Sequence, residues 1–116
     1  MTPKRGEVHL VDFGGGRGVE INKVRPALII QNDITNSYGE GMIVAAISAE
    51  KHREIYPSEV LVPKGEGGLD KNSVVVFNQI RTIDKVRLLK RLGQLRPATM
   101  RLVDRAITLS LGLVEF

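Results

Sequence analysis

The histidines are the first candidates for acid–base chemistry in this chain. It contains no cysteine and two histidines, His9 and His52. An imidazole pair could supply the acid and the base of an RNA cleavage reaction because imidazole titrates near neutral pH, but nothing in the sequence places the two together. His9 falls inside an expected strand and is typical of a packed structural residue, whereas His52 lies in a basic connection where it could contact phosphate. We assign neither histidine a catalytic role.

Arg25 is the charged residue whose position most needs an explanation. It precedes Pro26 at the beginning of an almost continuous apolar run. A charge at such a place needs a carboxylate or a bound anion to face it, so Arg25 could form a structural ion pair or could hold a phosphate. The residues alone leave both readings open. Ser48 closes another apolar run, so these two polar side chains both lie at strand ends.

The glycine-rich segment at residues 14–18 could be taken for a nucleotide-binding loop. The pattern G-x-G-x-x-G fails because Val19 stands where the last glycine should be, and no Gly-Lys-Ser or Gly-Lys-Thr follows. The glycines therefore indicate a hairpin connection rather than a phosphate cradle. The basic residues of this loop, Arg17 and Lys23, keep a binding role open.

The composition is that of an ordinary globular protein with a modest positive charge. The chain has 116 residues, 42% of them hydrophobic, and a net charge of +4. We expect a single domain over residues 1–116. The charge favours an anionic partner such as nucleic acid, although many small proteins are mildly basic for solubility alone. The lack of cysteine excludes disulfides and thiolate metal sites, and no apolar run approaches ~18 residues, so we expect a cytoplasmic protein without a membrane span.

Five or six short strands and one helix are expected along the chain. Apolar runs separated by clusters of Gly, Pro, Asn and Asp predict strands at residues 7–13, 25–31, 42–48, 58–62, 73 to about 81, and 88–95, while residues 32–39 carry turn and cap residues. After Pro97, apolar residues at helical spacing predict a closing amphipathic helix. These residues are Met100, Val103, Ile107, Leu111 and Val114. The pattern predicts an α+β, mainly β protein built as a small antiparallel barrel or a strongly bent sheet.

Four segments, in their order and spacing, resemble one known family. They are residues 4–8 (KRGEV), 24–33 (VRPALIIQND), 43–48 (IVAAIS) and 79–85 (QIRTIDK). The second and fourth blocks are specific, and the resemblance runs from Arg5 to the terminal helix. On these residues the chain resembles the MazF/PemK ribonuclease toxins of type II toxin–antitoxin systems.

The resemblance implies an SH3-like antiparallel barrel of the MazF/CcdB type that assembles as a homodimer. It also implies sequence-specific cleavage of single-stranded messenger RNA without a metal or other cofactor. In that reaction the RNA's own 2′-hydroxyl attacks the phosphorus and leaves a 2′,3′-cyclic phosphate and a free 5′-hydroxyl. The family's catalytic arginine falls on Arg25, and its catalytic threonine falls on Ser48, which keeps the hydroxyl and lacks the methyl group. A serine hydroxyl can still donate to a phosphate oxygen.

RNA contacts are expected from cationic and amide side chains around these strand ends. They are Arg17, Lys23, Asn32, Lys51, His52, Arg53 and Gln79. The family's usual inhibitor is an acidic, partly disordered antitoxin of the MazE type, which charge complementarity would draw to a basic groove. DNA contacts are expected only indirectly, through the complex with the antitoxin.

Two other functions compete with this interpretation. A gyrase poison of the CcdB type shares the barrel but inhibits a protein, and it would call for a tryptophan near the C-terminus, whereas this chain contains none. A non-cutting nucleic-acid-binding module is the second alternative, in which Ser48 marks a decayed active site and the basic surface only holds phosphate. Incubation with a long RNA in the presence of EDTA separates an enzyme from such a module.

Overall fold

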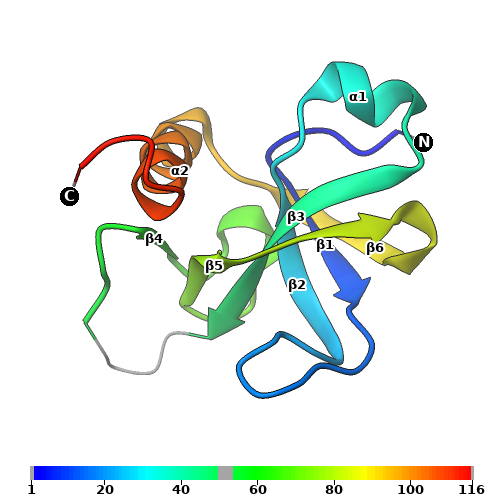
Figure 1. The fold of residues 1–116 in the computed structure, drawn as a ribbon, viewed down its shortest axis with the longest axis horizontal. Coiled ribbons are helices and arrows are strands. Elements are labelled where there is room, and N and C mark those ends of the chain that lie inside the picture. Colours follow the sequence, from blue (N-terminus) through cyan, green and yellow to red (C-terminus); the bar gives the residue numbers. More distant parts are fainter. Residues whose placement is uncertain (1, 50–53, 116) are drawn as a thin grey trace.

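Six strands form one strongly bent antiparallel sheet, and the chain closes with a helix packed against it (Figure 1). The computed structural model describes residues 2–49 and 54–115. The strands are β1 (Glu7–Asp12), β2 (Val24–Ile29), β3 (Gly41–Ala49), β4 (Glu59–Val62), β5 (Ser73–Asp84) and β6 (Leu88–Gln94). The described residues also form two α-helices, α1 (Asp33–Tyr38) and α2 (Pro97–Ser110), and two short 3₁₀ helices, η1 (Glu66–Gly68) and η2 (Lys85–Arg87).

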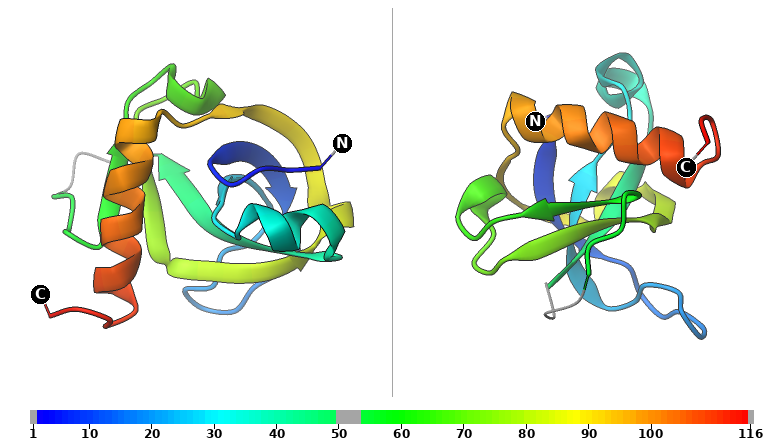
Figure 2. Two further views of the ribbon diagram at one scale, coloured as in Figure 1. Left: turned by 90° about the horizontal axis from the view of Figure 1, so that it is seen from above. Right: turned by 90° about the vertical axis from the view of Figure 1, so that its left-hand side faces the viewer.

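Hydrogen bonds join the strands in the order β4-β5-β3-β2-β1-β6, and each neighbouring pair is antiparallel. Figure 2 shows the sheet curling into an incomplete barrel, with α2 along one side. Within the described residues β4 and β6 are the sheet edges and do not pair with each other. The expected mainly β, antiparallel barrel-type fold with a closing helix is confirmed, with the barrel left open.

The 3₁₀ helix η1 packs against β6 and thereby links the two edges of the sheet. It follows β4 in the chain, and its backbone lies so near β6 that a Cβ added to Gly93 would come 2.5 Å from the carbonyl carbon of Gly67. A side chain at residue 93 would therefore force the two backbones apart. This close approach covers part of an edge that would otherwise present unpaired backbone groups.

The central strands are buried on both faces because the curled sheet encloses one core and carries another. Ala27, Leu28 and Ile29 of β2 are all fully buried, and so are successive residues of β3. Leu28 belongs to a core cluster that includes Val103 of α2, whereas Ile29 belongs to a second cluster with Phe13 and other residues of the sheet. Burial on both faces explains why these strands have continuous apolar runs in place of alternation.

Helix α2 begins as the sequence predicts and ends earlier than expected. Pro97 occupies its first turn, and the preceding Arg96 donates its backbone N–H to the Glu66 carboxylate at 3.1 Å. The helix ends at Ser110, so the expected continuation through Leu111 and Val114 is wrong, and both of those side chains are exposed. Gly112 follows with φ +73°, a left-handed conformation that commonly terminates helices. No helix in the described residues has both the length and the apolarity needed to cross a membrane.

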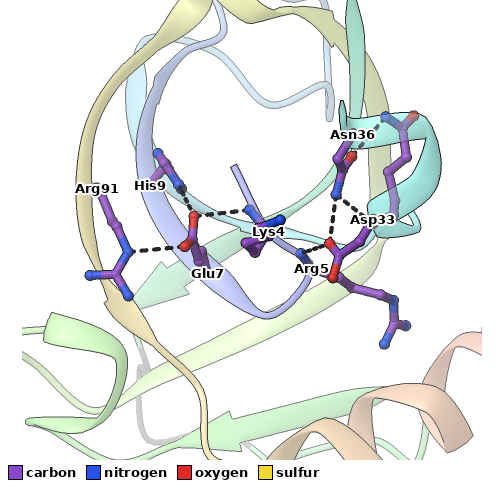
Figure 3. A network of polar contacts seen from close by, with 8 residues as sticks. Lys4, Arg5, Glu7, His9, Asp33, Asn36 and Arg91 are labelled. Atoms are coloured by element: carbon purple, nitrogen blue, oxygen red, sulfur yellow. Dashed lines mark hydrogen bonds and ion pairs between the residues drawn. The ribbon is translucent and has the colours of Figure 1, made fainter. Parts of the chain in front are cut away.

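Residues 33–38 form the short helix α1, where the sequence suggested only a turn with cap residues. Asn32 caps this helix by accepting the Thr35 N–H at 2.8 Å. Asn36 is buried and donates to the Gln31 carbonyl oxygen at 2.9 Å, and the Asp33 carboxylate accepts the backbone N–H of Arg5 (Figure 3). Six residues are too few for hydrophobic periodicity to show in the sequence, so only the cap could be recognised.

Candidate active site

Arg25 and Ser48 come together where β2 and β3 meet at one end of the sheet. The pairing of β2 with β3 ends at Ala27 opposite Ala46, two residues short of Arg25 on one strand and two residues short of Ser48 on the other. Both residues line a cavity of about 440 Å³, which we call the Arg25 pocket. The structure thus brings the two expected catalytic side chains to one place.

The guanidinium of Arg25 is exposed and lightly held. Its Nε donates to the carbonyl oxygen of Asn22 at 3.3 Å, and it forms no ion pair with a carboxylate of residues 2–49 or 54–115. The described residues therefore do not support a structural ion pair for Arg25, which was the alternative to a phosphate contact. A guanidinium with free N–H groups can bind two oxygens of a phosphate side by side.

Ser48 is half-buried between two neighbouring strands. On one side its register partner is Val74 of β5, and it shares the lining of the Arg25 pocket with Arg25. In the described part of the chain no hydrogen bond is found for its hydroxyl, which can donate one hydrogen bond and accept others. The hydroxyl is therefore available to a ligand in the Arg25 pocket.

A bulge in β5 delivers two more polar side chains to this pocket. Ala46 pairs with Val76, but the next residue, Ala45, pairs with Ile80, so three residues of β5 have no counterpart on β3. A bulge redirects side chains away from the regular alternation of a strand. Phe77 accordingly enters the core, while Asn78 and Gln79 line the pocket.

Gln79 holds the glycine-rich loop in place. Its Nε2 donates to the Val19 carbonyl oxygen at 2.6 Å, and its Oε1 accepts the Ile21 N–H at 3.0 Å. Both ends of the side-chain amide are thus engaged by the loop. The loop closes at its base where the Lys23 N–H donates to the Gly14 carbonyl oxygen at 2.7 Å. An RNA contact through Gln79 stays a prediction. In the structure the Gln79 amide positions the glycine-rich loop.

The other expected RNA contacts are scattered. Arg17 and Lys23 are exposed on the loop that borders the Arg25 pocket. The structure does not bring Asn32 there, because Asn32 follows the opposite end of β2 and caps α1. The expected contacts at residues 51–53 lie outside the described residues.

Sequence reasoning missed Asn78 and the two carboxylates of the pocket, Glu20 and Glu59. The available signal was the polar pair Asn78-Gln79, which interrupts an apolar strand and breaks its alternation. Glu20 is tied into the loop, where its Oε1 accepts the Arg17 N–H at 2.6 Å. The pocket therefore combines cationic, hydroxyl and amide donors with carboxylate acceptors, a set suited to a phosphodiester and to the base edges beside it.

Residues 4–111 match a protein family described as PemK-like, MazF-like toxins of type II toxin–antitoxin systems. This match covers nearly the whole chain. It includes every segment that lines the Arg25 pocket.

Solved structures of similar fold extend along the full chain. An endoribonuclease in complex with its cognate antitoxin, from a mycobacterial species, is 27% identical with a TM-score of 0.79, and the match covers 98% of this chain and 99% of that one. An endoribonuclease from a mycobacterial species is 25% identical with a TM-score of 0.77, covering 97% of this chain and 93% of that one. MazF from Deinococcus radiodurans, at 23% identity and a TM-score of 0.80, covers 97% of this chain and 98% of its own and shows the likeness of fold alone.

Proposed function

This chain belongs to the PemK-like, MazF-like toxins of type II toxin–antitoxin systems, and from that premise we propose that it is an endoribonuclease that cleaves single-stranded messenger RNA in the Arg25 pocket. The observation that carries the proposal is that Arg25 and Ser48 line the same open, polar pocket. The endoribonuclease names of two solved structures of the same fold support it.

The reaction follows from the donors and acceptors in the pocket. The 2′-hydroxyl of the RNA forms a bond to the adjacent phosphorus as the bond from phosphorus to the 5′-oxygen breaks. Arg25 donates to the phosphoryl oxygens as negative charge grows on them, and the Ser48 hydroxyl donates to another of these oxygens. The proton of the 2′-hydroxyl passes to an acceptor, for which the carboxylates of Glu20 and Glu59 line the pocket, and the leaving 5′-oxygen takes a proton from the Arg25 guanidinium or from water. The products are a 2′,3′-cyclic phosphate and a 5′-hydroxyl.

Metal-free chemistry is part of the proposal. The attacking oxygen belongs to the substrate, so neither a metal-bound water nor a protein nucleophile is needed.

Substrate selection is assigned to the glycine-rich loop and the β5 bulge. Arg17 and Lys23 on the loop contact the RNA backbone, while the amide of Asn78 reads a base that is unstacked from its neighbours. Aromatic residues make up only 4% of the chain, so base stacking contributes less here than hydrogen bonding.

An acidic, partly disordered antitoxin is the expected partner of this toxin. A related structure of the same fold is a complex with its cognate antitoxin, and the net charge of +4 suits an acidic inhibitor. The toxin acts as a homodimer in the cytoplasm, where messenger RNA is found. It contacts DNA only indirectly, through the antitoxin complex.

Cleavage of a long unstructured RNA in the presence of EDTA tests the proposed function. We expect discrete cuts whose upstream fragments end in a cyclic phosphate and whose downstream fragments begin with a 5′-hydroxyl. Sequencing the 5′ ends then gives the recognised motif. Tight binding of intact RNA would instead identify a non-cutting module, and cuts that depend on added metal would refute the mechanism.

A further inference from the structure

A second cavity lies at the edge of the sheet between β1 and β6. It has a volume of about 300 Å³ and shares no lining residue with the Arg25 pocket. Its polar lining consists of His9, Lys85, Lys90 and Arg91, and Leu88 and Leu89 form an apolar wall. We call it the β6 pocket. No aspartate or glutamate is among the described residues that line it.

His9 is buried under this pocket and has one unpartnered nitrogen. Its side chain is 10% exposed, and its Nε2 lies 3.0 Å from the Glu7 carboxylate. Figure 3 shows the other ring nitrogen, Nδ1, pointing away from Glu7. Every side-chain nitrogen or oxygen that is shut off from solvent in the described residues has a hydrogen-bond partner, and no partner is found for Nδ1. Nδ1 must therefore face open space, and the open space that His9 lines is the β6 pocket.

Glu7 fixes which nitrogen of His9 carries the hydrogen. Burial acts to raise the pKa of the Glu7 carboxyl, but hydrogen bonds from His9, from the backbone N–H of Lys4 and from Arg91 outweigh burial and hold the pKa below its ordinary value. The carboxylate is therefore ionised at neutral pH and accepts the hydrogen of Nε2.

The cations around the β6 pocket are only partly neutralised. Arg91 uses its Nε on Glu7 at 3.2 Å, which leaves its terminal nitrogens free of that ion pair. Lys85 donates to the neutral carbonyl oxygen of Asn36 at 2.8 Å, and Lys90 forms no ion pair within the described part of the chain. Glu7 balances one of these three charges, so the pocket has surplus positive charge.

We propose that the β6 pocket binds a phosphate group of the RNA, at a nucleotide remote from the cleaved bond. This assignment rests on the proposed function for its RNA ligand. Arg91 and Lys90 approach from β6 and His9 approaches from β1, so the donors are spread over two strands and suit the tetrahedral oxygens of a phosphate better than a planar carboxylate. The wall of Leu88 and Leu89 suits the sugar of the same nucleotide. The site adds a second point of attachment for longer RNA.

The His9 ring reports directly on occupancy of this site. We would follow its imidazole signals by NMR while titrating the full chain with a single-stranded oligoribonucleotide whose 2′-hydroxyls are methylated, so that binding is measured without cleavage. We expect the His9 signals to shift with a saturable dependence on oligonucleotide concentration. Unmoved His9 signals at saturation of the Arg25 pocket would overturn the proposal, and so would a shift caused only by an acidic peptide. If the chain does not cleave long RNA in the presence of EDTA but the His9 signals shift, the proposed reaction is wrong and the phosphate site stands.

Two variants that each remove one lysine charge, one inside the β6 pocket and one outside it, measure the phosphate contact. Each contact to single-stranded nucleic acid changes the slope of log affinity against log salt by about 0.7. Lys90→Gln should reduce the slope by about this amount for the same methylated oligonucleotide and weaken binding several-fold at low salt. Lys64→Gln, the same change at an exposed lysine that does not line the β6 pocket, should leave the slope unchanged. Equal slopes for both variants and the unaltered chain would contradict the site.

Discussion

The Arg25 pocket and the β6 pocket lie on the same sheet but hold their cations in opposite ways. Arg25 sits at an open strand end, is exposed, and has one carbonyl oxygen as a partner. Arg91 is anchored on a buried carboxylate that also receives His9 and the backbone of Lys4. The Arg25 guanidinium is thus left available to a ligand, whereas the Arg91 guanidinium is held by Glu7 and ties β6 to β1.

The supports of the two pockets differ as well. The Arg25 pocket is bordered by a glycine-rich loop and a bulge, elements that can adjust to a substrate. The β6 pocket is built on paired strands, where a buried polar network resists movement. Substitutions in the first region should therefore change the rate with little effect on stability, while substitutions in the second should change stability first.

Removal of the Arg25 guanidinium should have the largest effect. Arg25→Ala loses a charged donor to the transition state, which costs roughly 3 kcal/mol, on the order of a hundredfold in cleavage rate. Its melting temperature should be close to that of the unaltered chain because the side chain is exposed and has one weak contact. Single-turnover cleavage and thermal melts measure the two effects. Arg101→Ala, at an exposed arginine on α2, is the control, and near-normal cleavage by folded Arg25→Ala would refute the role.

Loss of the Glu7 carboxylate should destabilise the fold. Glu7→Gln removes the charge that receives His9 and Arg91 and should lower the free energy of unfolding by about 2 kcal/mol at neutral pH. Because the pKa of Glu7 is lowered in the folded chain, its stabilisation is present above the ordinary carboxyl pKa and is lost as the pH falls through the folded value. The difference between the two proteins should therefore shrink below about pH 4.

Urea unfolding across this pH range makes the measurement, with the exposed Glu40→Gln as the control. A difference that stays constant down to low pH would show that the ionised carboxylate is not the cause.

The hydroxyl of Ser48 should contribute less than the charge of Arg25. Ser48→Ala removes one neutral donor to a phosphoryl oxygen and should slow cleavage by roughly tenfold, in line with about 1.5 kcal/mol for such a bond. Ser48→Thr restores the hydroxyl and adds a methyl group that restricts the side-chain rotamer, so it should cleave at least as fast as the unaltered chain. Single-turnover rates distinguish the pair. Equal rates for alanine and threonine at this position would remove Ser48 from the mechanism.

Loss of one of the two hydrogen bonds from Gln79 to the glycine-rich loop should have the smallest effect. Gln79→Glu keeps an acceptor for the Ile21 N–H but loses the donor to the Val19 carbonyl oxygen, a loss of about 1 kcal/mol. Hydrogen exchange at the Ile21 amide should speed up several-fold, and kcat should fall more than KM rises because the loop carries the carbonyl that holds Arg25. A rise in KM alone, with Ile21 exchange unchanged, would instead support a direct RNA contact.

Much of this fold could be predicted because its signals are local. The apolar runs of β2 and β3, the glycines between β1 and β2, and Pro97 at the beginning of α2 all appear in short stretches of sequence. The segment of α1 and the end of α2 at Ser110 could not be placed as well. Six residues carry too little periodicity, and a helix end depends on backbone conformation at Gly112 as much as on residue type.

The candidate site shows the same division. Family resemblance pointed to Arg25 and Ser48, and both indeed lie at strand ends. Asn32 belongs to the same block of sequence as Arg25, residues 24–33, yet strand β2 lies between the two and carries Asn32 to the other end of the sheet. Linear proximity therefore misplaced one residue, while the distant Asn78 reached the pocket through the bulge.

The sequence by itself determined the succession of strands along the chain, the closing helix, the modest positive charge and the two residues to which the family resemblance assigns catalysis. Only the tertiary structure decided that Arg25 and Ser48 line one pocket, that Gln79 holds the loop, and that His9, held by Glu7, lines a second cationic pocket. The physical reason is register: these neighbours meet through pairing of strands far apart in the chain, and a shift of one residue would turn each side chain to the opposite face.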